Sequence, residues 1–110
     1  MDNDLKSLLA DILNAINEIF DFLPEKRNFL QFREDIKTRK AIERNIEIIG
    51  EAVSKILKKQ PEIDISYARK IVDTRNRIIH SYDKVSEDII WAIEIKDLPF
   101  LQKEILKLLE

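Results

Sequence analysis

The spacing of apolar residues along the chain predicts long helices. Between positions 5 and 23 an Ile or Leu recurs at alternating intervals of four and three residues, which is the spacing of one helical face. These residues are Leu5, Leu9, Ile12, Ile16, Ile19 and Leu23. A second series follows at Ile42, Ile46, Ile49, Val53 and Ile56. With one glycine and three prolines, the chain has too few turn-forming residues for an all-β protein, so we expect an all-α fold.

Prolines set expected boundaries of the first three helices. The first helix should end near Pro24, which also favours a short second helix over about residues 25–32. A long helix should run from about Lys37 to Lys58, before Pro61 ends it. Gly50 lies inside this helix. Because a mid-helix glycine costs about 1 kcal/mol relative to alanine, we expect another backbone or a ligand to approach Gly50 closely.

Two serines are expected to cap the remaining helices. Ser66 should cap a helix whose apolar seam contains Ala68, Ile71 or Val72, and Ile78 or Ile79. Ser86 should cap the last segment, whose apolar stripe keeps its phase through Pro99 and therefore predicts one kinked helix or two nearly collinear ones. That stripe contains Trp91, Ile95, Leu98, Leu101, Ile105 and Leu108. We therefore expect an antiparallel bundle of four to five helices that forms one domain over residues 1–110.

The charge and composition restrict the class of protein. A net charge of -2 argues against non-specific coating of nucleic acid, so any contact with nucleic acid should be local. The absence of cysteine excludes disulfide scaffolds, thiolate zinc sites and cysteine nucleophiles. The N-terminus is acidic, and no apolar run approaches the roughly 20 residues that span a bilayer. We expect a cytoplasmic protein that does not enter a membrane.

An arginine interrupts the apolar seam of the fourth helix. Steps of three and four residues from Ile71 lead to Arg75, Ile78 and Tyr82, so a guanidinium occupies a position where the pattern requires a hydrophobic residue. A buried arginine needs a paired acceptor. Glu47 and Glu51 lie on the long helix beside Gly50, and we expect Glu51 to be this acceptor.

His80 is the only histidine, and its neighbours suggest a site. Asn76 and His80 are separated by four residues and share a helical face, so the amide is placed to orient the imidazole. Arg75 and His80 are five residues apart and diverge by about 140° around the axis. Either the helix ends or bends near His80, or a second copy of the chain supplies Arg75 across the axis of a C2 dimer.

These residue types suit acid/base chemistry on a phosphodiester without a metal ion. In RNA the 2′-hydroxyl is an internal nucleophile, so His80 needs only to move a proton while Arg75 stabilises charge on phosphoryl oxygens. Tyr82 is placed to hold the phosphate or a base. No second acidic cluster joins Glu47 and Glu51 at a metal-binding spacing, and we expect neither metal nor cofactor. A single helical histidine is more often structural than catalytic, so the residues alone leave both interpretations open.

Three segments, in order, resemble the HepT-like proteins of the HEPN superfamily. The middle segment is the motif R-x-x-x-x-H-x-Y, with Arg75-Asn76 followed by His80-Ser81-Tyr82. The others are Glu47-Ile48-Ile49-Gly50-Glu51-Ala52, which is similar to the family's Ile-Gly-Glu-Ala segment, and Trp91 with Asp97-Leu98-Pro99-Phe100-Leu101 in the last helix. The resemblance extends from about Leu5 to the C-terminus.

The resemblance implies a homodimeric helical bundle whose motifs face each other across the interface. It implies an endoribonuclease toxin of a type II-like toxin–antitoxin pair, with Arg75 and His80 as catalytic residues and Asn76 and Tyr82 in support. The implied partner is an MNT-like nucleotidyltransferase antitoxin, which silences the toxin by transferring AMP onto Tyr82. Bulk and negative charge there would repel a substrate phosphate.

Two questions stay open at this point. The basic run Lys37, Arg39, Lys40 and Arg44 fits either a groove for RNA or a solvated face, since acidic residues interleave it. The alternative function is a non-catalytic helical module that binds a nucleotidyltransferase partner or a nucleotide. Cleavage of RNA by the free protein discriminates the two functions.

Overall fold

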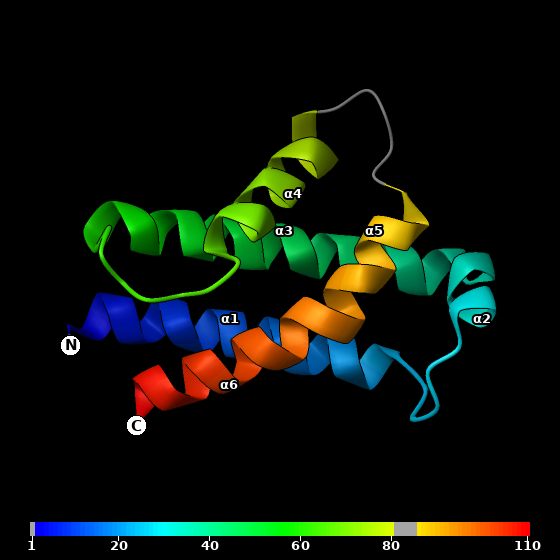
Figure 1. Cartoon of the computed structure of the whole chain (residues 1–110), viewed down its shortest axis with the longest axis horizontal. Helices are drawn as coiled ribbons and strands as arrows, with labels where there is room; N and C mark the ends of the chain where they lie inside the picture. The colour runs from blue at the N-terminus through cyan, green and yellow to red at the C-terminus, as the bar shows by residue number, and fades with distance from the viewer. Residues whose placement is uncertain (1, 81–85) are drawn as a thin grey trace.

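The chain forms helices joined by short connections (Figure 1). A computed structural model describes residues 2–80 and 86–110. It contains no strand within these ranges, which confirms the expected all-α fold. The elements are α1 (Asn3–Phe22), α2 (Phe29–Glu34), α3 (Ile36–Lys59), α4 (Ala68–His80), α5 (Glu87–Ala92), the π-helical turn η1 (Ile93–Asp97) and α6 (Leu98–Leu109).

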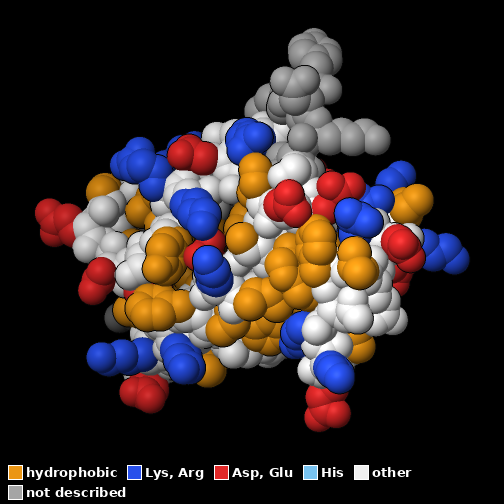
Figure 2. All heavy atoms as spheres, turned by 45° about the vertical axis from the view of Figure 1, so that its right-hand side comes forward, with side chains coloured by type: hydrophobic (Ala, Val, Ile, Leu, Met, Phe, Trp, Pro, Cys, Tyr) orange, Lys and Arg blue, Asp and Glu red, His pale blue; other side chains and the backbone are white. Residues whose placement is uncertain are grey.

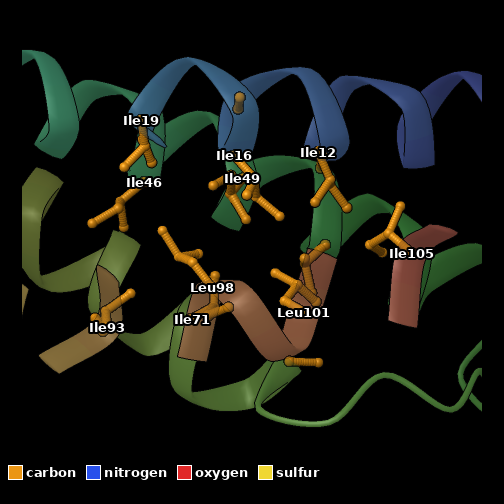
Figure 3. Packing of buried hydrophobic residues seen from close by; sticks show 14 of the residues in the cluster. Ile12, Ile16, Ile19, Ile46, Ile49, Ile71, Ile93, Leu98, Leu101 and Ile105 are labelled. Carbon is orange, nitrogen blue, oxygen red and sulfur yellow. The ribbon is translucent and has the colours of Figure 1, made fainter. Parts of the chain in front are cut away.

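The two longest helices form the base of the bundle. α1 and α3 pack side by side along the long axis of the molecule, α4 packs on α3, and α6 packs on α1 (Figure 1). Every residue of the two sequence stripes is buried, from Leu5 to Leu23 and from Ile42 to Ile56. In Figure 3, Ile16 of α1 and Ile49 of α3 meet Leu98 of α6. Burying each side chain of this size contributes about 1.5–3 kcal/mol.

α2 begins later than the sequence predicts. The helix starts at Phe29, because the Asn28 side chain caps it by accepting a hydrogen bond from the backbone N–H of Gln31 at 3.1 Å. The expected start at Glu25 is therefore wrong, and residues 25–28 connect α1 to α2. The ring centroids of Phe29 and Phe32 lie 5.6 and 5.3 Å from that of Trp91, so α2 packs against α5.

The expected cap of α4 is displaced by one residue. The carbonyl of Tyr67, not that of Ser66, accepts the first helical hydrogen bond, from the N–H of Ile71 at 3.0 Å. Tyr67 has a φ of 61°, in the left-handed region. The N–H of Ser66 instead donates to both carboxylate oxygens of Glu104 on α6, at 3.2 and 3.1 Å. This pairing ties the entry to α4 onto α6.

The last helical segment changes phase, contrary to the expectation. Ser86 does cap α5, since its hydroxyl oxygen accepts a hydrogen bond from the N–H of Ile89 at 3.3 Å. The π-helical turn η1 then turns less per residue than an α-helix, so Ile93 and Leu98, five residues apart, are both fully buried. Ile95, which the unbroken stripe placed inside, is exposed. Pro99 lies in the first turn of α6, where its missing N–H is tolerated.

No helix in the described part of the chain combines the length and the apolar character needed to cross a membrane.

Candidate active site

α4 carries the predicted site. Arg75, Asn76 and the backbone of His80 belong to this helix, which is α-helical at every residue from Arg75 to His80. The helix therefore does not bend between Arg75 and His80, whereas the expected end of the helix near His80 falls at the limit of the described residues and stays a prediction. The side chain of His80, together with Ser81 and Tyr82, lies outside the described residues, so its predicted hydrogen bond with Asn76 stays a prediction.

Gly50 on α3 makes room for Arg75. A Cβ atom built on Gly50 would lie 2.3 Å from the Cβ of Arg75, 2.8 Å from its Cγ and 3.3 Å from the carbonyl oxygen of Ile71. Contacts as short as 2.3 Å do not occur between real side chains, so no other residue fits at position 50 without moving α4. The expectation that another segment approaches Gly50 closely is confirmed, and the segment is the one that carries the motif.

Arg75 is half buried, and its guanidinium bonds to its own neighbour. Its Nη1 donates a hydrogen bond to Oδ1 of Asn76 at 2.9 Å. The Nε atom is buried and has no hydrogen-bond partner among the residues that the structure describes. Asn76 is exposed. The side chain of Arg75 therefore lies with its stem on α3 and its head group held against Asn76.

The expected pairing of Arg75 with Glu51 is wrong. Glu51 pairs with Lys55 on the same helix at 3.4 Å, and Glu47 pairs with Arg44 at 3.0 Å. Residues spaced by three or four along a helix are neighbours, so these local pairs form without any contact to α4. The guanidinium finds its acceptor in Asn76 instead.

Thr74 occupies the buried position next to Arg75, a role that sequence reasoning missed. Its hydroxyl donates to the carbonyl oxygen of Lys70 at 2.9 Å, which satisfies a polar side chain that is almost fully buried. The seam of α4 therefore contains Ile71 and Thr74, while Ile79 is exposed. Thr74 lies three residues after Ile71, at the same spacing as the hydrophobic residues. This spacing could have predicted its burial.

An ion pair anchors the chain where α5 begins. Nη1 of Arg39, near the start of α3, lies 2.9 Å from Oε1 of Glu87 in the first turn of α5. Arg44 is also engaged, with Glu47. Two of the four cations of the basic run 37–44 thus have carboxylate partners, whereas Lys37 and Lys40 are exposed. This pairing favours a structural role for Arg39 over RNA binding.

The π-helical turn holds two buried acids. Asp97 pairs with Lys70 of α4, with 2.8 Å between Oδ2 and Nζ. Glu94 is 1% exposed, and both of its carboxylate oxygens lack a hydrogen-bond partner within the described ranges. Burial in this apolar setting raises the pKa of Glu94 to about 8, although the charge of Arg27 opposes the shift. Sequence reasoning did not single out either acid.

The described residues contain no group of three or more His, Asp or Glu side chains arranged to hold a metal ion.

Comparison with known proteins assigns the chain to a family. A family model described as "Ribonuclease HepT-like" matches residues 12–108 of the chain. The chain belongs to the ribonuclease HepT-like family. Membership of this HepT-like family and the observed all-α architecture confirm the expected HEPN fold.

Relatives of this HepT-like chain span most of its length. "Probable ribonuclease HepT" of Thermococcus cleftensis is 36% identical over 107 residues, which cover 94% of both chains. "Putative RNase MJ0127" of Methanocaldococcus jannaschii is 35% identical over 106 residues, which cover 93% of this chain and 84% of the relative. "Putative RNase TTE0752" of Caldanaerobacter subterraneus subsp. tengcongensis is 32% identical over 102 residues, covering 89% and 91% respectively. No solved structure matches the chain.

Proposed function

We propose that this HepT-like chain is an endoribonuclease that needs no metal ion and serves as the toxin of a type II-like toxin–antitoxin pair. The observation that carries the proposal is the seating of Arg75. Its stem lies against Gly50 and its guanidinium bonds to Asn76, on the helix that reaches His80. The names of the relatives, which describe them as ribonucleases, support the same activity.

Each motif residue has a chemical role in this proposal. His80 moves the proton of the 2′-hydroxyl or protonates the leaving oxygen. Arg75 binds the scissile phosphate and stabilises the charge that develops on its oxygens, because a guanidinium stays charged and meets phosphate with two parallel hydrogen bonds. Asn76 fixes the direction of the guanidinium through the bond at 2.9 Å. A side chain held in place before the substrate arrives needs less ordering during the reaction.

The proposed working unit is a homodimer. Because every residue of α4 from Arg75 to His80 is α-helical, these two positions stay about 140° apart around its axis. A second copy, related by a two-fold axis, would bring the Arg75 of one chain to the His80 of the other. The large side chains of Ile79 on α4 and Ile95 on η1 are exposed, and burying them against a partner would be favourable. These exposed side chains support self-association.

The proposed regulator is an MNT-like nucleotidyltransferase antitoxin. Transfer of AMP from ATP to the hydroxyl of Tyr82, with release of pyrophosphate, would place a phosphodiester two positions after His80. Its negative charge and bulk would then compete with the substrate phosphate for Arg75. Two observations support this step: the motif resembles that of HepT-like proteins, and the chain belongs to that family.

Cleavage of RNA in the presence of EDTA tests the function. We expect the wild-type chain to cleave RNA in EDTA, and we expect Arg75→Ala and His80→Ala each to lose cleavage by at least about a hundredfold while circular dichroism stays unchanged. Arg33→Ala, an exposed arginine of α2, is the matched control and should cleave like the wild type. Equal cleavage by all variants would contradict the proposal, and no cleavage by the wild type would favour the alternative, a non-catalytic module that binds a nucleotidyltransferase or a nucleotide.

A further inference from the structure

An exposed aromatic pair lies where the start of α4 meets α6. Tyr67 is 47% exposed and Phe100 is 48% exposed. Their ring centroids are 5.8 Å apart and their planes meet at 84°, so the edge of one ring faces the other. Much of the surface of both rings therefore meets solvent. Two adjacent exposed rings form an apolar patch, and such patches mark sites of interaction with a ligand or partner.

One lysine contacts the pair, and two more follow Phe100 along α6. The Nζ of Lys70 lies 5.9 Å from the centroid of the Tyr67 ring. Lys103 and Lys107 follow Phe100 by three and seven residues along α6, which places all three on one side of the helix. Figure 2 shows hydrophobic side chains exposed beside lysine and arginine side chains on the face that it displays. Aromatic rings and cations thus share one surface.

The nearest acids do not neutralise this surface fully. Asp97 pairs with Lys70 at 2.8 Å, and Glu104 accepts the N–H of Ser66 with both of its oxygens. Asp64 lines a pocket with Lys107 but forms no ion pair with it within 4.0 Å. Across residues 2–80 and 86–110, neither Lys103 nor Lys107 forms an ion pair within 4.0 Å. These two ammonium groups are therefore available to a ligand that carries negative charge.

We infer that the surface formed by Tyr67, Phe100, Lys103 and Lys107 binds single-stranded RNA. The rings offer faces for stacking of bases, and the lysines bind phosphates, which together make a site that tolerates any base sequence. The rings alone would also suit a protein partner, but the two exposed lysines favour a polyanion, because lysine is depleted at protein interfaces. The inference rests on the proposed ribonuclease function, since it assigns this surface to the substrate strand beyond the cleaved bond.

The position of the surface suits this role. α4 contains 13 residues and is therefore roughly 20 Å long, with Tyr67 directly before its first residue and His80 as its last described one. A strand that crosses this length of α4 would contact the aromatic pair at one end and the catalytic motif at the other. The surface would then increase affinity for longer strands without taking part in the proton transfer.

Binding of an uncleavable RNA tests the inference. The probe is a fluorescein-labelled mixed-sequence strand of about 12 nucleotides with 2′-O-methyl ribose throughout, which lacks the internal nucleophile, and anisotropy reports binding to the full chain. Phe100→Leu should weaken binding about tenfold, because leucine keeps the bulk and loses the stacking face. Lys103→Gln should reduce the slope of log K against log salt by about 0.7.

Matched controls make the result specific. Phe22→Leu removes a ring that is 42% exposed at the end of α1, and Lys58→Gln removes an exposed charge at the end of α3. Neither should change the affinity by more than about twofold. Equal effects in control and test variants would overturn the inference, as would a wild-type chain that does not bind the strand. Loss of self-association in Phe100→Leu with unchanged RNA affinity would instead assign the surface to a second copy. Because the probe cannot be cleaved, each of these outcomes leaves the cleavage assay to decide the proposed function separately.

Discussion

Arg75 occupies the space that any side chain at position 50 would fill. The Cβ of Arg75 lies 2.3 Å from the place of a Cβ on Gly50, so the two helices α3 and α4 meet at backbone distance at the residue that binds the substrate phosphate in our proposal. The only glycine of the chain therefore fixes the position of its motif helix.

Gly50→Ala should lower both stability and cleavage. The added methyl forces α4 away from α3, and such overpacking costs about 1–3 kcal/mol, partly offset by the roughly 1 kcal/mol by which alanine exceeds glycine in helix propensity. We expect a net loss of up to about 2 kcal/mol in urea unfolding and a larger loss of cleavage than this explains. In an Arg75→Gly background the same change should cost less, because only the contact with the Ile71 carbonyl remains. An equal cost in both backgrounds would contradict the contact.

Glu94 should make stability fall as pH rises. Its pKa in the folded chain is about 8, above the ordinary value of 4.5, so the folded state holds this proton more tightly than the unfolded state. The contribution of the protonated Glu94 to stability is fully present below pH 4.5 and is lost between pH 4.5 and about 8, by up to about 5 kcal/mol. Urea unfolding from pH 5 to pH 9 should show the stability of Glu94→Gln gaining on that of the wild type as pH rises. A constant difference would contradict the burial of a protonated carboxyl, and Glu62→Gln, at an exposed position, is the control.

The pair between Lys70 and Asp97 should hold α4 to η1. Asp97 is almost fully buried, so Lys70→Met leaves its carboxylate without a partner charge and should cost about 1–3 kcal/mol. Lys70→Met combined with Asp97→Asn should recover most of that loss, because a neutral amide replaces the unpaired charge. Thermal unfolding of the two variants measures both effects. A double variant less stable than Lys70→Met would show that the pair is not the source of the loss.

The sequence predicts the long helices well because their apolar residues follow one period throughout. Leu5 to Leu23 and Ile42 to Ile56 are buried as expected. The π-helical turn was missed, since Ile95 and Leu98 fit an unbroken α-helical stripe as well as a shifted one. Only packing against the rest of the bundle selects between these phases. The start of α2 was missed because the Asn28 cap competes with the preference of Pro24 for a first helical turn.

The site was predictable in part. The cost of a glycine inside a helix correctly indicated a close approach at Gly50. The acceptor of Arg75 was predicted wrongly, because spacing along α3 places Glu51 near Gly50 but does not show that Lys55 pairs with it first. Glu94 escaped prediction since its burial depends on how η1 turns. His80 and Tyr82 stay predictions of the motif.

Mixing two inactive variants tests the shared site most directly. Arg75→Ala retains His80, and His80→Ala retains Arg75, so a mixed dimer contains one complete site only if each site takes Arg75 from one chain and His80 from the other. After equal mixing and subunit exchange, half of the dimers are mixed and each holds one of two sites, so about a quarter of the wild-type cleavage should return. Cleavage that stays at the level of the separate variants, with sedimentation showing that mixed dimers have formed, would contradict a site shared between two chains.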